Sequence, residues 1–351
     1  MKFADLSGRR TLFFGSTQPY LFVKTAAFFG EPAWIHRVYG ADEQRTLRKA
    51  CHIIEPVIDL LCFDKHLDAL AEVEVIFTTW MMPRLESHHL DRMPALRAVF
   101  FAAGSVKSFA EPLLERNIVL VSARKVNAIP TAEFAFAQIL LSMKGCFRNQ
   151  REYRNPESIY LAYRGPGNYD ESVALLGMGA VGSHLAGLLK PVDVRVLAYD
   201  PFLSEARAAA LGVELVSLEE AFSRGFVVSN HMPYLPETEG ILTADLFALM
   251  QPNATFINTA RGGIVDQPGM IDVLMKRPDI QALLDVSNPE PPENDSPLFS
   301  MPNVFLTAHM AGAINNEVRR LGRACVQEFQ AWERGQTLEH AVTMEEVSCM
   351  A

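Results

Sequence analysis

The sequence of 351 residues is poor in cysteine, and its cysteines show no pairing pattern. The number is odd and no C-x-x-C pair occurs, which argues against a disulfide framework or a zinc site. We therefore expect reduced thiols at Cys51, Cys62, Cys146, Cys325 and Cys349. Adjacent His88 and His89 have no further ligand at a recognisable spacing, so we interpret them as a polar loop and expect no bound metal.

An excess of positive charge is also missing. The net charge is −9, which argues against nucleic acid or an anionic membrane as the main partner, because either requires a basic face. We expect no apolar stretch to reach the ~18 residues that span a bilayer, and residues 1–12 lack the long apolar core of a secretion signal. We therefore expect a small-molecule partner, no membrane or nucleic-acid partner, and a cytoplasmic location.

Hydrophobic residues make up 49% of the chain, which excludes disorder, and the length suits two domains. Short apolar runs alternate with helical stretches, a pattern typical of parallel α/β sheets. In the first unit the strand candidates are Leu12–Gly15, Val75–Thr79, Ala98–Phe101 and Val119–Val121. In the second unit, Leu185–Leu189 and the later candidates Phe226–Ser229, Thr255–Asn258, Ala282–Val286 and Val304–Thr307 continue this pattern.

Between the units lies Pro130–Lys144, a stretch that is apolar on nearly every face. Pro130 suits a first helical turn and Glu133 favours the helix dipole there, so we predict a helix beginning at this point. It must be buried by a domain junction, a second subunit, or both. We interpret the charges of Arg148–Arg154 as a solvated helix end, and expect the periodic stretch Asn315–Gly335 to pack back on the first unit.

The most informative segment contains Gly177, Gly179 and Gly182 in G-x-G-x-x-G spacing, between an apolar run and an amphipathic stretch. This order predicts a βαβ dinucleotide site. Gly177 allows the tight turn, Gly179 lets the backbone approach a pyrophosphate, and Gly182 lets the helix pack closely on the strand. The phosphates would lie on free N–H groups at the helix start.

A second apolar run ends at Asp200, 18 positions after Gly182. An aspartate here accepts hydrogen bonds from the hydroxyls of an adenosine ribose and repels a 2′-phosphate, so it favours NAD over NADP. The alternative interpretation of Asp200 is a strand-end turn with Pro201.

Three further motifs place chemically active side chains after predicted strands, where open α/β sheets bind ligands. They contain Arg261, Glu290 and His309. Arginine offers a planar fork for a carboxylate, histidine transfers protons near neutral pH, and a neighbouring glutamate orients the ring. Taken singly, each has an alternative interpretation: Arg261 as a surface ion pair, Glu290 as a solvated loop charge and His309 as a hydrogen-bonded cap. Together, after a nucleotide fingerprint, they predict reversible oxidation of a hydroxy acid.

The motifs GMGAVG, HMP, NTARGG, LDVSNPEP and TAHMAG, together with the strand end at Asp200, occur in one order. In this the chain resembles the D-isomer-specific 2-hydroxyacid dehydrogenase family over roughly residues 70–315. The resemblance implies NAD-dependent interconversion of a 2-hydroxy acid and its 2-oxo acid. It also implies that Arg261, Glu290 and His309 are catalytic.

The same resemblance implies further roles. The loop at Gly104 and Ser105 would bind the substrate carboxylate together with Arg261, and Asp285 would contact the nicotinamide carboxamide. The remaining cofactor positions would be Ala180, Val181, Pro233, Thr259 and Ala260, beside the three glycines and Asp200.

The implied fold is α/β, with two Rossmann-like doubly wound parallel-sheet domains and the cofactor domain inserted into a flavodoxin-like substrate domain. Residues 1–125 and 313–351 would form the substrate domain and residues 126–312 the NAD-binding domain. The resemblance also implies a two-fold homodimer formed mainly by the cofactor domains.

The sequence departs from the family pattern at AAGSVKSF, residues 102–109, which replaces a Gly-rich segment, so Lys107 has no transferred role. Trp80, Met81 and Met82 are equally consistent with pocket lining and with core packing. Two alternatives stay open at this point: an NAD(H)-sensing corepressor-like protein, and a formate or phosphite dehydrogenase of the same fold.

Overall fold

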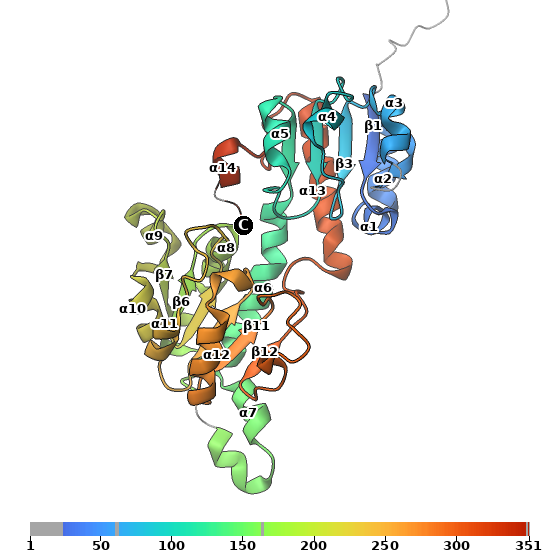
Figure 1. The fold of residues 1–351 in the computed structure, drawn as a ribbon. Coiled ribbons are helices and arrows are strands. Elements are labelled where there is room, and N and C mark those ends of the chain that lie inside the picture. The colour runs from blue at the N-terminus through green and yellow to red at the C-terminus, as the bar shows by residue number, and fades with distance from the viewer. Residues whose placement is uncertain (1–23, 60–62, 163–164, 349, 351) are drawn as a thin grey trace, which may run out of the picture.

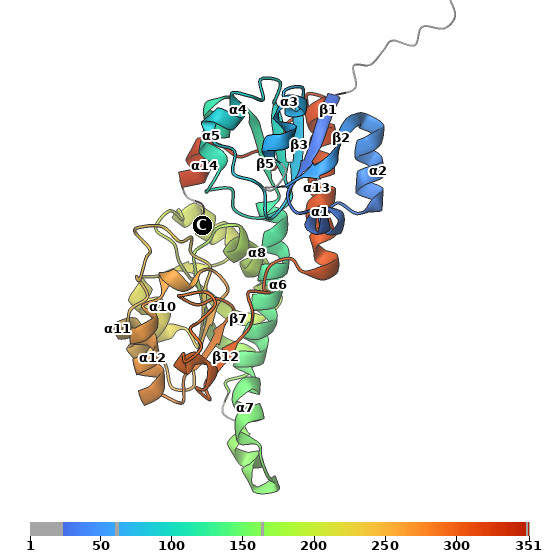
Figure 2. The same ribbon diagram turned by 45° about the vertical axis from the view of Figure 1, so that its right-hand side comes forward.

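The computed structural model describes residues 24–59, 63–162, 165–348 and 350. The predicted strand Leu12–Gly15 lies outside the described residues, as do Cys62 and Cys349. The chain forms two units, each built around a parallel sheet, and the long helix α6 (Arg124–Met143) runs along both (Figures 1 and 2).

The sheet of the first unit has the strand order β2-β1-β3-β4-β5, and all its strands are parallel. This is the flavodoxin-like order and confirms the prediction for this unit. The strands are β1 (Lys24–Phe29), β2 (Cys51–Ile58), β3 (Val75–Thr78), β4 (Ala98–Phe101) and β5 (Val119–Ser122). The register is even: Val75 pairs with Ala98, and Ala98 with Val119, so the carboxyl ends of these strands meet at one edge.

Helices cover both faces of this sheet because its strands are apolar on both sides. The segments are α1 (Pro32–Val38), α2 (Ala41–Ala50), η1 (Phe63–His66), α3 (Leu67–Leu70), α4 (Ser87–Leu90), α5 (Ala110–Glu115), η5 (Asn315–Glu317), α13 (Val318–Glu333) and α14 (Met344–Ser348). Phe329 of α13 lies edge-on to Phe77 and Phe100 of the sheet. Helix α13 thus packs back on the first unit, as expected for the stretch Asn315–Gly335.

The sheet of the second unit has the order β12-β11-β10-β9-β6-β7-β8, again all parallel. In chain order this is the Rossmann arrangement with one further strand, and it confirms the predicted fold class. The strands are β6 (Tyr169–Leu176), β7 (Asp193–Tyr199), β8 (Glu214–Leu215), β9 (Val227–Asn230), β10 (Thr255–Asn258), β11 (Gln281–Leu284) and β12 (Val304–Leu306).

The helical segments of this unit lie on both faces of the sheet. They are α7 (Cys146–Glu152), η2 (Pro156–Ala162), α8 (Ala180–Leu189), α9 (Glu205–Leu211), α10 (Leu218–Arg224), α11 (Ala244–Leu249), η3 (Gly262–Ile264), α12 (Gln267–Lys276) and η4 (Pro297–Phe299). Leu185–Leu189, grouped with the strand candidates, is the second half of α8 and no strand. Leu185 and Leu189 lie in the core. Leucines at this spacing are compatible with one face of a helix as well as with a buried strand, so the apolar run alone does not distinguish the two.

Helix α6 begins six residues before the expected start, so Pro130 lies inside it. One side is buried against α8 and the sheet through Ala132, Ala135 and Ile139, whereas Leu141 is 43% exposed. The expectation that nothing is long and apolar enough for a bilayer is wrong for α6, which meets that criterion by length and composition. A core helix meets it equally well, and α6 is packed as one.

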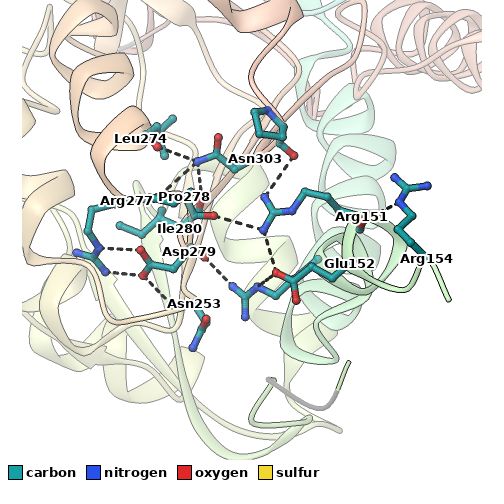
Figure 3. Close-up of polar contacts among 12 residues, drawn as sticks. Arg151, Glu152, Arg154, Asn253, Leu274, Arg277, Pro278, Asp279, Ile280 and Asn303 are labelled. Carbon is teal, nitrogen blue, oxygen red and sulfur yellow. Dashed lines mark hydrogen bonds and ion pairs between the residues drawn. The ribbon is translucent and has the colours of Figure 1, made fainter. Parts of the chain in front are cut away.

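The charged segment after α6 is not a solvated helix end. Arg148 is buried and donates to the carbonyl of Asp279 at 2.6 Å, and Arg151 donates to the carbonyls of Pro278 and Pro302 (Figure 3). Asp279 in turn is paired with Arg277. The arginines satisfy carbonyls of loops before β11 and β12, so they fix α7 to the edge of the sheet opposite the fingerprint.

We expect Phe329→Ala to destabilise the protein by about 3–5 kcal/mol, because it empties the contact between α13 and the first sheet. Phe299→Ala is the matched control, since Phe299 is 61% exposed and its loss should change stability by at most about 0.5 kcal/mol. Denaturant unfolding measures both. Equal effects of the two substitutions would show that α13 is not part of this core.

Candidate active site

The carboxyl ends of both sheets border one cleft of about 810 Å³. Most of the predicted cofactor and substrate positions line it. They are Gly104, Ser105, Gly177, Gly179, Ala180, Val181, Asp200, Pro233, Thr259, Ala260 and Arg261. Gly182 lies beneath this surface, and Asp285, Glu290 and His309 belong to loops after β11 and β12, farther along the same edge of the sheet.

Two of the fingerprint glycines are fixed by backbone contacts. Gly177 has φ +89°, which favours glycine, and a Cβ there would lie 2.8 Å from the carbonyl oxygen of His231. A Cβ on Gly182 would lie 2.0 Å from the carbonyl oxygen of Gly177. These positions therefore need glycine for the turn and for the approach of α8 to β6, as the spacing predicts.

Gly179 differs from them, because a Cβ there would meet no atom within 4 Å. It borders open space at the start of α8, where the amides of Ala180 and Val181 begin a helix of ten residues. Unbonded N–H groups and the positive end of the dipole favour an anion at such a place. The fingerprint therefore fits a pyrophosphate through backbone groups alone.

Asp200 lies at the end of β7 and faces the same loop. Its carboxylate accepts hydrogen bonds from the N–H groups of Met178, at 2.7 Å, and Phe202, at 2.9 Å. A strand-end turn and the binding of ribose hydroxyl groups are thus compatible roles for Asp200. A carboxylate has about four acceptor positions, and the described residues occupy two of them.

Arg261 follows β10 and is held by a buried amide network that the sequence analysis did not identify. Asn258 donates to the carbonyl of Arg261 at 3.1 Å and accepts from the N–H of Ala260 and from Asn230. The guanidinium donates to the carbonyl of Ala260, and none of the ion pairs among the described residues includes it. Burial lowers the pKa of Arg261, while Glu290 raises it. A partly buried cation without a carboxylate partner favours an anionic ligand.

His231, from the HMP motif, lines the floor of the cleft between Ser229 and Thr259. Its ring nitrogens lie 2.9 Å from Ser229 Oγ and 3.4 Å from Thr259 Oγ1. Desolvation by the surrounding protein lowers the pKa of His231 to about 3. The ring is therefore neutral at pH 7 and adds no charge beside the predicted cofactor positions.

His309 and Glu290 form a close polar pair. Nδ1 of His309 lies 2.5 Å from Oε1 of Glu290, and both side chains reach solvent. His309 has φ +51°, a conformation unusual for a side-chain-bearing residue and found where surrounding structure imposes it. This geometry leaves Nε2 as the nitrogen available to a substrate.

Asp285 imposes that conformation. Its buried carboxylate accepts from Thr307 Oγ1 and from the N–H groups of Met310 and Ala311, while its carbonyl accepts from the N–H of His309. Asp285 therefore holds the His309 loop in this structure. Three acceptor positions are occupied, which leaves room for one further donor such as an amide.

The Gly104 loop is fixed by hydroxyl groups from neighbouring strands. Ser122 donates to the carbonyl of Gly104 at 2.6 Å, and Thr79 to that of Ala102 at 2.9 Å. With these carbonyls bound inside, the amides of Gly104 and Ser105 border the cleft, which suits a carboxylate. Only the fold reveals the role of Ser122, because no local pattern links it to Gly104.

Two contacts join the units beside this loop. Asn127 of α6 accepts from the N–H of Ala313 at 3.1 Å, and a Cβ on either Gly104 or Gly312 would lie 3.5 Å from its amide nitrogen. Lys107 Nζ donates to the carbonyl of Tyr234 across the cleft at 3.3 Å. Among the residues that the structure describes, no group of three His, Cys, Asp or Glu is placed to hold a metal ion.

The profile described as "D-isomer specific 2-hydroxyacid dehydrogenase, NAD binding domain" matches residues 136–311. The chain belongs to this family. The match contains the fingerprint, Asp200 and the loops of Arg261, Glu290 and His309, so the second unit is the NAD-binding domain. Open space at Gly179 and the free start of α8 fit this cofactor.

Curated relatives share 27–33% of residues with the chain over part of their length. D-3-phosphoglycerate dehydrogenase of Archaeoglobus fulgidus is 30% identical over 66% of this chain and 44% of its own. The enzyme of that name from Mycobacterium bovis is 28% identical over 80% of this chain and 53% of its own. The chain thus spans about half the length of these relatives.

Solved structures share the fold over almost the whole chain. D-mandelate dehydrogenase from Rhodotorula graminis has a TM-score of 0.77 and 22% identity, covering 92% of this chain and 98% of its own. A phosphoglycerate oxidoreductase from Rhizobium etli has a TM-score of 0.77 and 23% identity, covering 92% and 99%. At such identities the likeness shows the fold alone.

We expect Gly179→Ala to raise the Kd for NADH about tenfold or more, because the added methyl group occupies the open space where the pyrophosphate approaches. The melting temperature should stay unchanged, since that space contains no protein atom. Gly187→Ala on the same helix is the control: it should leave the Kd nearly unaltered and, if anything, raise the melting temperature, because alanine favours the helix more than glycine does. Fluorescence titration with NADH measures the Kd, and an unchanged value for Gly179→Ala would contradict the assignment.

Proposed function

We propose that the protein is an NAD-dependent oxidoreductase that interconverts a D-2-hydroxy acid and the corresponding 2-oxo acid. The observation that carries this proposal is the His309–Glu290 pair, 2.5 Å apart, on the same edge of the sheet as Arg261. An acid–base group and a carboxylate-binding cation beside a nicotinamide cofactor are the groups that this reaction requires.

In the reductive direction, the fork of Arg261 and the amides of Gly104 and Ser105 bind the carboxylate and orient the 2-oxo group. The amides at the start of α8 and the carboxylate of Asp200 would hold NADH, which would supply the hydride for C2. His309 donates the proton from Nε2 to the oxygen as negative charge develops there. Glu290 accepts a hydrogen bond from Nδ1, which orients the ring so that Nε2 is available for the transfer. In the oxidative direction His309 acts as the base.

Cofactor selection is assigned to Asp200 in this proposal. Its carboxylate has unoccupied acceptor positions for the hydroxyl groups of the adenosine ribose, and its charge disfavours a 2′-phosphate. These groups bind the carboxylate and the 2-oxo group and do not select the substrate's side chain. Turnover of a panel of 2-oxo acids with NADH measures that selection directly. Turnover of formate or phosphite instead would select the corresponding alternative within this fold.

We expect His309→Ala to lower kcat by about 10²–10⁴-fold while the Kd for NADH changes little, because the substitution removes proton transfer and no cofactor contact. Glu290→Gln should lower kcat less, since the amide oxygen of Gln still accepts a hydrogen bond from Nδ1 but carries no charge. His88→Ala is the control, as His88 lies in α4 of the first unit. Normal turnover by His309→Ala would overturn the catalytic assignment.

We also propose a homodimer formed through the second unit. The exposed side of α6 carries Leu141, and the projecting segment after it exposes Tyr153, Ile159 and Tyr160 (Figures 1 and 2). Tyr160 is 84% exposed although it is large and amphipathic. The Arg148 network holds α7 in position, and an ordered projection with apolar side chains suits a self-complementary contact with a second copy.

We expect light scattering at micromolar concentration to give the mass of a dimer, and Leu141→Asp with Tyr160→Asp to give that of a monomer. The reason is that two carboxylates would be placed in an apolar contact. Met275→Asp is the control, because Met275 is 66% exposed on α12, away from α6. A monomeric mass for the unaltered protein would remove the dimer and leave the enzymatic proposal intact.

A further inference from the structure

Helix α14 belongs to the first unit but reaches the cofactor cleft. The segment before it is fixed to β5: Val342 N–H donates to the carbonyl of Leu120 at 2.8 Å, and Ser122 N–H to that of His340 at 3.0 Å. From there the chain turns towards the second unit, and α14 lies on the side of the first unit that faces it (Figures 1 and 2). The position of α14 is thus set by the edge of the first sheet.

A charged contact ties α14 to the first turn of α6. Glu346 accepts from Thr343 N–H at 3.1 Å through Oε2 and pairs with Arg124 through Oε1. Thr343 Oγ1 accepts from Glu346 N–H in return. One carboxylate therefore both caps α14 and connects it to Arg124, and each side chain is only partly exposed.

The same residues line the cleft. Arg124, Glu346 and Met350 border it from the first unit, while Phe202, Leu203 and Arg207 border it from the second. This end of the cleft adjoins Asp200, whereas Glu290 and His309 are not part of its lining. Met350 is buried with the core of the first unit, so it forms a firm surface there.

The charge of the cleft also suits a dinucleotide. Its ionised lining residues are four cations and two anions: Arg124, Lys125, Arg207, Arg261, Asp200 and Glu346. Lys125 donates to the carbonyl of Glu339, and Arg207 to Ser183 Oγ at the start of α8. Positive charge therefore surrounds the fingerprint from both units, which favours a pyrophosphate between them.

We propose that α14 and Met350 form the second wall of the dinucleotide site and hold the adenosine half of the cofactor against Asp200. The Arg124–Glu346 pair fixes this wall. The adenosine half is then enclosed between the two units, and the nicotinamide half lies farther along the cleft, towards Arg261 and His309. Loosening the wall weakens contacts to one half of the cofactor only.

The test is equilibrium binding of three ligands: NADH, ADP-ribose as the adenosine half, and reduced nicotinamide mononucleotide as the other half. The first variant is Arg124→Gln with Glu346→Gln, which removes the pair, keeps the net charge of the cleft and keeps an acceptor for Thr343 N–H. The second is Met350→Ala, which alters packing without charge. Each should raise the Kd for NADH and ADP-ribose by about two- to fivefold and leave the Kd for the mononucleotide unchanged.

Two controls separate the wall from general effects. Asp91→Asn with Arg116→Gln removes another ion pair of the first unit, far from the cleft, and should change no Kd. The melting temperature of each variant shows whether it is folded under the conditions of titration. These measurements need no turnover, so their outcome is independent of the catalytic assignment.

Three outcomes would overturn the proposal. Unchanged binding of NADH in both variants would show that α14 does not contact the cofactor. Equal weakening of all three ligands would place the effect on the whole cleft. Tighter binding of NADH by either variant would show that α14 obstructs the site. Tighter binding by the single variant Glu346→Gln, with the double variant equal to the unaltered protein, would lead to the same conclusion.

Discussion

The arrangement of the site depends on one close backbone contact, that of Gly182 in α8 with the carbonyl of Gly177 after β6. No side chain fits there, so the helix starts directly at the carboxyl edge of the sheet. The free amides of α8 and the carboxylate of Asp200 then face the cleft. The register between β6 and β7 fixes their positions relative to each other. The loops carrying Arg261, Asp285 and His309 leave the same edge, so cofactor and acid–base groups are aligned by the sheet itself.

Much of this could be predicted from local patterns. The fingerprint, the strand ends and the order of motifs give residue types at fixed spacing, and seven of the eight strand candidates within the described residues correspond to observed strands. Strands β1, β2 and β8 were not identified. β2 contains Pro56 and has several exposed residues, and β8 has two residues, so neither produces a periodic apolar signal. Leu185–Leu189 is helical because its leucines satisfy both periods.

The supporting contacts could not be predicted because they join residues distant in sequence. Ser122 donates to Gly104, Asn230 donates to Asn258 before Arg261, and Asp285 fixes His309. Each of these side chains is short and polar and lies in an apolar run. Such a residue, taken alone, indicates a strand end or a turn. Arg148 was misinterpreted for a related reason: its charge predicts solvent exposure, but loop carbonyls at the far edge of the second sheet accept its hydrogen bond in the interior.

Helix α6 explains how two separate sheets can form one site. Its first turn carries Arg124, Lys125 and Asn127 at the cleft, while its later turns pack against α8 beneath the fingerprint. Because Asn127 also binds the backbone of Ala313, the helix fixes the Gly104 loop relative to the segment after His309. A helix shared by both units therefore restricts their movement relative to each other, and the hydrogen bond from Lys107 to the carbonyl of Tyr234 is a further link between them.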